Sequence, residues 1–196
     1  MNENFVILKD ANDSLLNTFL IKGGKKMRYG VAVFPSKEVQ DEANSYRMRY
    51  DPHYALIQPH MTVKEPFEVN EKELDTIIST LNDIAKVTKP FPLKVSKVSS
   101  FAPVTNTIYL KVEPVEALLN LTQTLHQDPL PNKNTYPFVP HITIGQKLSN
   151  DEFSDVFGSL RIQQFDIEEP VEEMQLVYQL EDGSWAVHDT FKFGKE

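Results

Sequence analysis

The chain has 196 residues, of which 40% are hydrophobic and 24% charged, and its 28 acidic residues outnumber its 20 basic residues to give a net charge of −8. This composition supports one packed domain and argues against a disordered chain. The acidic balance is the opposite of what a protein needs to wrap a nucleic-acid backbone, so we expect no long nucleic-acid groove. The absence of Cys excludes disulfides, thiolate nucleophiles and Cys-ligated zinc.

The N-terminal segment, residues 1–26, is predicted to be an extension to a single domain over 27–196. It ends in KGGKK at 22–26, a linker-like run. Lys-Gly-Gly can be encoded by a purine run that matches a bacterial ribosome-binding site, so one hypothesis is a translated leader with the native start at Met27. The alternative is a true extension whose apolar patch at 5–8 packs on the body.

The segment carries no signal-peptide pattern, and no apolar run in the chain approaches the roughly 20 residues of a membrane helix. We therefore expect a soluble, cytoplasmic protein with no membrane partner.

Hydrophobic periodicity predicts an α+β order of elements. Ser36 and Asn70 are candidate N-caps, and Asp182-Gly183 is a candidate two-residue hairpin turn. Strands are predicted at 28–34, 58–64, 91–102, 106–113, 138–145, 161–168, 173–181 and 185–193, and helices at 37–50, 71–87, 114–126 and 150–160.

The predicted order contains a loose internal repeat. Strand, helix, strand and helix follow one another over 28–87 and again over 106–160. No linker separates the two copies, so we expect two similar α+β lobes within one domain.

The third element of each copy carries the same motif, a Pro followed by His-apolar-Thr-apolar. These are His60-Met61-Thr62-Val63 and His141-Ile142-Thr143-Ile144, with the two His 81 residues apart. On a strand, alternation places His and Thr on one face and the apolar pair in the core. One imidazole can then accept a proton while the other donates one, and the hydroxyls can donate to the oxygens of an anion. This set of groups suits metal-free chemistry at a phosphorus centre.

The two motifs resemble those of the 2H phosphoesterase superfamily, which is defined by a pair of His-x-Thr/Ser motifs. The runs RYGVAVFPS, YDPHYALIQPHMTVKEPFE and YPFVPHITIGQ are similar to the YjcG-like branch of that superfamily. The resemblance implies a bilobal fold in which antiparallel sheets face a central groove with helices outside. It also implies metal-independent cleavage of 2′,3′-cyclic or 2′,5′-phosphodiesters, with His60 and His141 as acid–base catalysts and Thr62 and Thr143 as phosphate ligands.

Other residues near the motifs have two interpretations each. Tyr54 and Tyr136 lie before the motif strands, where they could stack on a base or pack against the sheet ends. We expect Lys64 to alternate away from His60 as a rim or solvent residue. We expect Glu65 to share the His60 face, where it either orients an imidazole or ends the strand.

The remaining basic candidates are assigned structural or surface roles. Arg47 and Arg49 could reach a phosphate, but a solvated helix end is the expectation for both. His53, His126 and His188 have no matching partner in the sequence, and His126 lies near a helix C-terminus, which favours a cation.

Alternative functions differ in how well the residues fit them. The chain contains no H-x-H or H-x-x-x-H spacing of the kind that a zinc hydrolase uses, and no G-x-S-x-G motif of a Ser hydrolase. A non-catalytic module that binds a nucleotide or RNA end remains open, as does an RNA 2′,5′-ligase that runs the reverse reaction. We expect a monomer that needs no cofactor and takes a small nucleotide or an RNA terminus as substrate.

Overall fold

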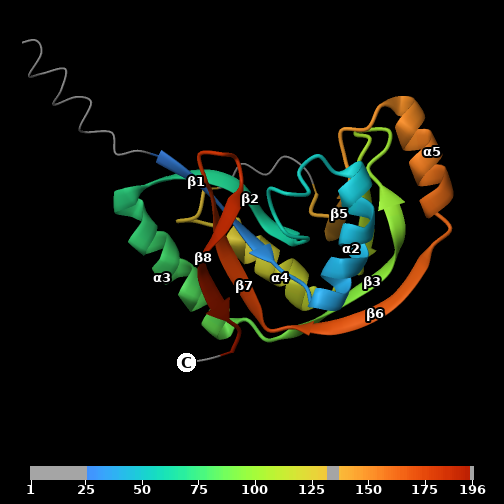
Figure 1. Ribbon diagram of the computed structural model, residues 1–196. Helices are drawn as coiled ribbons and strands as arrows, with labels where there is room; N and C mark the ends of the chain where they lie inside the picture. Colours follow the sequence, from blue (N-terminus) through green and yellow to red (C-terminus); the bar gives the residue numbers. More distant parts are fainter. Residues whose placement is uncertain (1–25, 132–136, 195–196) are drawn as a thin grey trace, which may run out of the picture.

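Two four-stranded antiparallel sheets lie side by side in the computed structural model (Figure 1). The structure describes residues 26–131 and 137–194, so the expectations for residues 1–25 and for Tyr136 lie outside the described residues. The first sheet has the order β2 (Met61–Asn70), β1 (Lys26–Val33), β7 (Glu173–Gln179), β8 (Trp185–Lys192). The second has the order β5 (His141–Gly145), β4 (Ile108–Val112), β3 (Phe91–Ser100), β6 (Gln164–Val171). The predicted bilobal α+β fold is confirmed.

Four helices connect the strands of the described residues: α2 (Lys37–Tyr50), α3 (Glu71–Val87), α4 (Glu116–Leu125) and α5 (Asn150–Leu160). Three of them have the predicted bounds, because capping residues define where they begin. At α5, Ser149 Oγ accepts from the Glu152 N–H at 3.3 Å and the Ser149 N–H donates to the Glu152 carboxylate at 2.9 Å. The helix predicted over 114–126 begins two residues later, at Glu116. No helix among the described residues is long and apolar enough to cross a membrane.

The helices are exchanged between the two sheets. Helix α2 follows β1 of the first sheet but packs on β5 of the second (Figure 1). Helix α4 follows β4 of the second sheet but contacts β2 of the first, and it also contacts α3. Each motif strand therefore lies against a helix that follows, in the sequence, a strand of the other sheet. This interleaving brings residues of α2 close to both motif strands.

The two motif strands occupy equivalent places. Strand β2 is the edge of the first sheet beside β1, and β5 is the edge of the second sheet beside β4. Alternation along both strands is as predicted, since the apolar motif residues Met61, Val63, Ile142 and Ile144 are at most 1% exposed. The strand predicted over 58–64 instead runs from Met61 to Asn70, so His60 stands immediately before β2.

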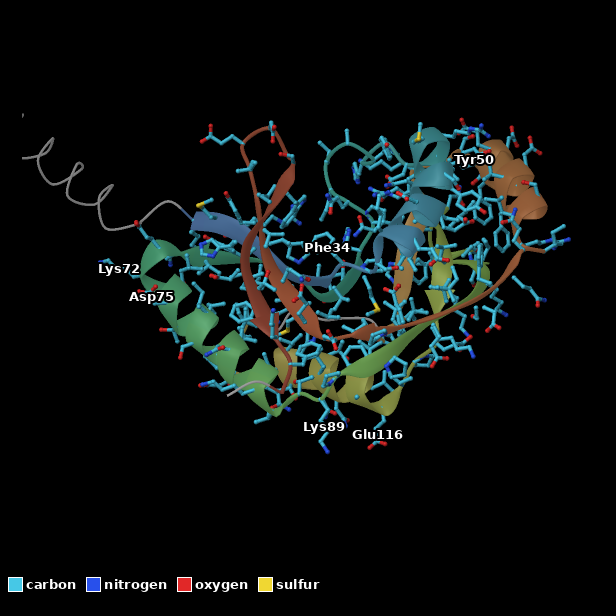
Figure 2. The ribbon with its side chains drawn as sticks, turned by 60° about the horizontal axis from the view of Figure 1, so that its bottom comes forward. Phe34, Tyr50, Lys72, Asp75, Lys89 and Glu116 are labelled. Atoms are coloured by element: carbon cyan, nitrogen blue, oxygen red, sulfur yellow. The ribbon has the colours of Figure 1, made fainter. Side chains whose placement is uncertain are left out.

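The apolar core joins residues of both sheets, among them Leu176 of the first sheet and Leu93 and Leu110 of the second, which are fully buried. Figure 2 shows that the charged side chains of Lys72 and Asp75 point away from the core on the outer side of α3. This arrangement follows from the amphipathic pattern of α3.

The β7–β8 hairpin differs from its prediction by one residue. The Leu180 N–H donates to the Ser184 carbonyl at 2.8 Å, and the Gly183 N–H donates to the Leu180 carbonyl at 3.0 Å. The loop is therefore Glu181–Gly183, three residues rather than two, with Gly183 at φ 86° in the left-handed region that Gly adopts without strain.

Candidate functional site

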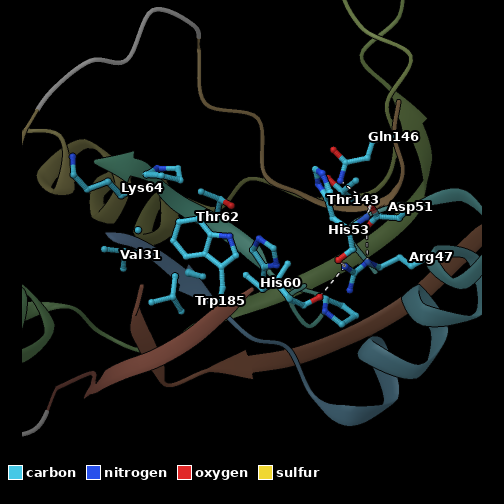
Figure 3. Close-up of a pocket in the computed structure, with 16 residues that line it drawn as sticks. Val31, Arg47, Asp51, His53, His60, Thr62, Lys64, Thr143, Gln146 and Trp185 are labelled. Atoms are coloured by element: carbon cyan, nitrogen blue, oxygen red, sulfur yellow. Dashed lines mark hydrogen bonds and ion pairs between the residues drawn. The ribbon is translucent and has the colours of Figure 1, made fainter. Parts of the chain in front are cut away.

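A pocket of about 350 Å³ lies where the two motif strands approach each other. His60 and Thr62 line it from the first motif, and Thr143 lines it from the second (Figure 3). The structure thus brings three of the four predicted motif residues to one cavity. The fourth, His141, does not line this pocket; it begins β5 two residues before Thr143, and its charge contributes to the lowered pKa of His60.

The two motif histidines make the same backbone contact. The Nδ1 of His60 hydrogen-bonds the Gln58 carbonyl at 2.8 Å, and the Nδ1 of His141 hydrogen-bonds the Val139 carbonyl at 2.7 Å. A carbonyl oxygen only accepts, so Nδ1 carries the proton in each ring. In the neutral ring Nε2 is then an unprotonated base, and in the cation Nε2–H is an acid. Each motif therefore presents one nitrogen for proton transfer.

Desolvation lowers the pKa of both imidazoles, so each ring is neutral over a wider pH range than it would be in water. Desolvation is the main cause that lowers the pKa of His60 to about 4, and the charges of Arg47 and His141 lower it further. Desolvation also lowers the pKa of His141, while the negative charge of Glu65 acts in the opposite direction. The two rings thus have unlike charged neighbours: at His60 the effect of Arg47 exceeds the opposite effect of Asp51, whereas at His141 the neighbouring charge is the Glu65 carboxylate.

Aromatic rings pack against the two imidazoles. The ring of Phe34 lies 6.0 Å from His60, while Phe101 and Tyr109 lie 4.9 and 5.3 Å from His141 in edge-on geometry. These contacts restrict ring rotation, so each Nε2 has a defined direction.

The hydroxyls of Thr62 and Thr143 face the same pocket and are half-buried. Within the described residues, neither hydroxyl makes a hydrogen bond to another protein group. Both are therefore available to donate to an anion in the pocket.

Arg47 and Asp51 form a buried network that lines this pocket. Arg47 Nε donates to Asp51 at 2.8 Å, and its guanidinium also donates to the Ile57 carbonyl at 2.8 Å. The other oxygen of Asp51 accepts from the His53 backbone N–H at 2.9 Å and from Gln146 at 2.8 Å (Figure 3). The network ties the end of α2 to the loop that precedes His60 and to the residue that follows β5.

The expectation of a solvated Arg47 is therefore wrong, since Arg47 is 2% exposed, whereas Arg49 is exposed as expected. The reason is the packing of α2 on β5, which covers the face that carries Arg47. The spacing of Arg47 and Asp51, four residues apart, could have predicted the ion pair from the sequence. The burial of the pair could not be predicted in this way, because it depends on the second sheet.

The expectations for Lys64 and Glu65 are also wrong. Residues an even number apart share a face of a strand, so Lys64 and not Glu65 continues the row of His60 and Thr62. Lys64 lines the pocket, is 2% exposed and donates to the Pro131 carbonyl at 2.8 Å. Its burial lowers the pKa of the ammonium group to about 8. Glu65 is exposed and accepts from His126 at 3.1 Å.

Of three other predicted residues, only His53 lines the pocket. Tyr54 is 39% exposed and lines a neighbouring hollow rather than the His60 pocket. His53 lines the pocket and accepts from Lys147 at 2.9 Å. His188 lies on β8 and contacts Asp189 at 2.8 Å. The sequence interpretation did not consider Trp185, which lines the His60 pocket through the β7–β8 hairpin.

No group of three or more His, Asp or Glu side chains suited to a metal ion occurs in the parts of the chain that the structure describes, 26–131 and 137–194.

Comparison with known proteins places this architecture in a family. The model of the 2′-5′ RNA ligase superfamily matches residues 35–183, a span that contains both motifs. The chain belongs to the 2′-5′ RNA ligase superfamily. The predicted relationship to 2H phosphoesterases is thereby confirmed.

Proteins named as putative phosphoesterases are similar to the chain over most of its length. "Putative phosphoesterase BH1439" of Halalkalibacterium halodurans is 55% identical over 170 residues, which cover 87% of this chain and 99% of that protein. "Putative phosphoesterase GWCH70_0799" of Geobacillus sp. (strain WCH70) is 55% identical over 168 residues, which cover 86% of this chain and 97% of that protein. The enzyme class predicted from the motifs, a phosphoesterase, agrees with these names.

Solved structures share the superfamily's fold at lower identity. TT0787 of Thermus thermophilus has a TM-score of 0.66 at 22% identity, and E. coli LigT complexed with 3′-AMP has a TM-score of 0.68 at 15% identity. Each comparison covers 87% of this chain and 100% of the other chain. At this identity the likeness establishes the two-lobed fold.

Proposed function

We propose that the chain is a metal-independent phosphoesterase that hydrolyses a 2′,3′-cyclic or 2′,5′-phosphodiester in a small nucleotide or at an RNA terminus. His60 and His141 exchange protons with the reacting oxygens, and Thr62 and Thr143 hold the phosphate. The observation that carries this proposal is the pair of equivalent backbone contacts at Nδ1, which leave Nε2 of both imidazoles available for proton transfer.

The reaction needs one proton acceptor and one proton donor. Nε2 of the neutral imidazole takes a proton from water as the water oxygen attacks phosphorus. The bond from phosphorus to the leaving ribose oxygen breaks, and Nε2–H of the second imidazole protonates that oxygen. The product is a phosphomonoester. The two imidazoles have then exchanged protonation states, and they return to the starting state by proton exchange with solvent.

The surrounding charges support a division of roles. Arg47 disfavours the cationic form of His60 more than Asp51 favours it, which suits a base, whereas the Glu65 carboxylate favours the cationic form of His141, which suits an acid. We therefore assign His60 as the base that activates water and His141 as the acid that protonates the leaving oxygen. The hydroxyls of Thr62 and Thr143 donate hydrogen bonds to the phosphate oxygens.

A small nucleotide is the substrate class that fits both composition and relatives. The net charge of −8 opposes a long polyanion, while a pocket of about 350 Å³ is large enough for a small ligand. LigT, which shares the fold, has been solved with 3′-AMP, the product that opening of a 2′,3′-cyclic AMP can leave.

The test is hydrolysis of 2′,3′-cyclic AMP by the full chain and by His variants. His60→Ala and His141→Ala should each lower kcat by on the order of 10²–10⁴, and EDTA should not reduce the activity of the unmodified chain. His188→Ala is the matched control, because His188 contacts Asp189 on β8 and does not line the pocket.

The outcomes separate the competing functions. Loss of activity in EDTA that added metal restores would contradict metal-independent chemistry. Binding of 3′-AMP without turnover of cyclic nucleotides or 2′,5′-linked oligomers would favour the non-catalytic binding module. Joining of RNA ends without hydrolysis would favour the ligase.

A further inference from the structure

Trp185, the single Trp of the chain, lines the pocket that contains His60 and Thr62. Figure 3 shows its indole beside His60, on the side of the pocket opposite Arg47 and Asp51. The ring comes from the first residue of β8 and is half-buried. The pocket thus combines the polar groups of the motif strands with one broad, flat apolar surface.

The backbone that carries the indole is held in place by its surroundings. The Trp185 backbone N–H donates to the Leu56 carbonyl at 2.8 Å, which ties the hairpin to the loop before His60. The hairpin tip is fixed by Asp182, which accepts from the Ser184 backbone N–H at 2.9 Å and from its hydroxyl at 2.6 Å. A surface fixed in this way loses little conformational entropy when a ligand binds to it.

One face of the indole already has a partner. The guanidinium of Arg28 lies 6.0 Å from the ring centre, and Arg28 does not line the pocket. The cation therefore contacts the ring outside the cavity. The part of the ring that lines the cavity is left for a ligand.

Tyr54 is the rival aromatic residue on this side of the site. It lines a separate hollow with Leu56, Gln58 and Ser184, and its ring lies 5.9 Å from the Arg47 guanidinium. Trp185 and Ile57 line both hollows, whereas Tyr54 lines only the second. Of the two aromatic residues, Trp185 is therefore the one that a flat group attached to a phosphate at His60 can contact within the same pocket.

We propose that Trp185 is the stacking platform for the nucleobase of the substrate. Every base has a π face, and aromatic side chains bind such faces with little sequence preference. The substrate class is then a phosphodiester whose neighbouring ribose carries a heteroaromatic base, and the protein should prefer it to base-free phosphodiesters. This inference rests on the proposed function, because it identifies the group attached to the reacting phosphate.

The single Trp makes a direct test possible in the full chain. Titration with 3′-AMP should change the Trp185 fluorescence in a saturable manner, because stacking alters the indole's environment, whereas inorganic phosphate should bind with little change in emission. Trp185→Leu should weaken 3′-AMP binding measured by calorimetry by roughly 5- to 150-fold, the range expected for loss of base–aromatic stacking. The same variant should change the affinity for inorganic phosphate by less than about threefold, and Trp185→Phe should recover part of the lost affinity.

Val187→Ala is the matched control, since Val187 is 50% exposed on the same strand and does not line the pocket. It should bind 3′-AMP like the unmodified chain. Binding of 3′-AMP by calorimetry without a change in emission, together with unchanged affinity in Trp185→Leu, would overturn the platform and leave the phosphodiester chemistry standing. Failure of 3′-AMP and phosphate to bind, with no turnover of cyclic nucleotides, would instead contradict the proposed function.

Discussion

Arg47 and Asp51 form a buried ion pair at the end of α2, with 2.8 Å between Nε and Oδ2 and less than 4% of either side chain exposed. The pair also supplies hydrogen bonds to the loop before His60 and accepts one from Gln146, beyond β5. A buried charge whose partner is removed is costly, because the remaining charge has neither water nor a counterion. The ion pair therefore links the stability of the fold to the positions of both motif strands.

Arg47→Met should lower the free energy of unfolding by about 3–5 kcal/mol, the cost of leaving a buried carboxylate without its partner. Arg49→Met removes a similar side chain from an exposed position on the same helix and should change the free energy by no more than about 0.5 kcal/mol. Urea unfolding at pH 7 measures both values. Equal effects of the two substitutions would show that the Arg47–Asp51 pair contributes nothing specific.

The pH dependence of kcat/KM should be bell-shaped and centred at mildly acidic pH. The profile should rise through about pH 4 as His60 loses its proton and becomes a base. It should fall at a pH below 6.5 as His141, whose pKa is also lowered, loses the proton that it must donate. A bound phosphodiester carries a negative charge that raises both pKa values, so the profile of kcat should lie at higher pH.

Glu65→Gln tests the assignment of the two limbs. The Glu65 carboxylate raises the pKa of His141, so its removal should move the descending limb to lower pH and leave the ascending limb in place. Glu68→Gln is the control, because Glu68 lies on the same strand and pairs with Lys26 at 3.6 Å. Movement of the ascending limb alone in Glu65→Gln would reverse the roles assigned to His60 and His141.

The hydroxyls of Thr62 and Thr143 should contribute to phosphate affinity rather than to folding. Thr62→Val and Thr143→Val keep the side-chain shape but remove a donor to a charged oxygen, so each should weaken 3′-AMP binding by about 10- to 150-fold. Thr62→Ser should retain most of the affinity. Thr124→Val, which removes a hydroxyl bonded to the Asn120 carbonyl on α4, should have no effect on binding. Calorimetry with unaltered affinity in both motif variants would refute the phosphate role.

The local parts of this fold were predictable from the sequence because local rules determine them. Helices at 37–50, 71–87 and 150–160 follow capping residues and carry apolar faces, and their bounds in the structure are the predicted ones. The motif strands alternate as expected because their apolar residues can only be buried in one register. These features place His60 with Thr62, and His141 with Thr143, on common faces.

The remaining parts of the site depend on contacts between elements distant in sequence. Arg47 is buried because α2 packs on β5 of the other sheet, and nothing within α2 specifies that exchange. Trp185 reaches the pocket because β8 pairs with β7 and the hairpin bonds to Leu56. The error at Lys64 had a different cause, since strand alternation alone places it on the face of His60 and Thr62.

Lys64 provides a last prediction, because its ammonium group is buried and donates to the Pro131 carbonyl, a neutral acceptor. Burial lowers its pKa to about 8, whereas an unfolded chain has a Lys pKa of about 10.4. Between these values the unfolded state binds more protons than the folded state, so the folded state gains stability as the pH rises. Below pH 8 both states are protonated, and this contribution does not change with pH.

The difference in unfolding free energy between the unmodified chain and Lys64→Met isolates this effect, because other titrating groups are common to both. From about pH 8 to 10.4 the unmodified chain should gain stability relative to Lys64→Met, with a slope that approaches but does not exceed about 1.4 kcal/mol per pH unit. Lys72→Met on the exposed side of α3 should give a difference that is flat with pH. Urea unfolding across this pH range makes the measurement. A flat difference for Lys64→Met would mean that the ammonium group is solvated and that Lys64 does not titrate as a buried residue of the pocket wall.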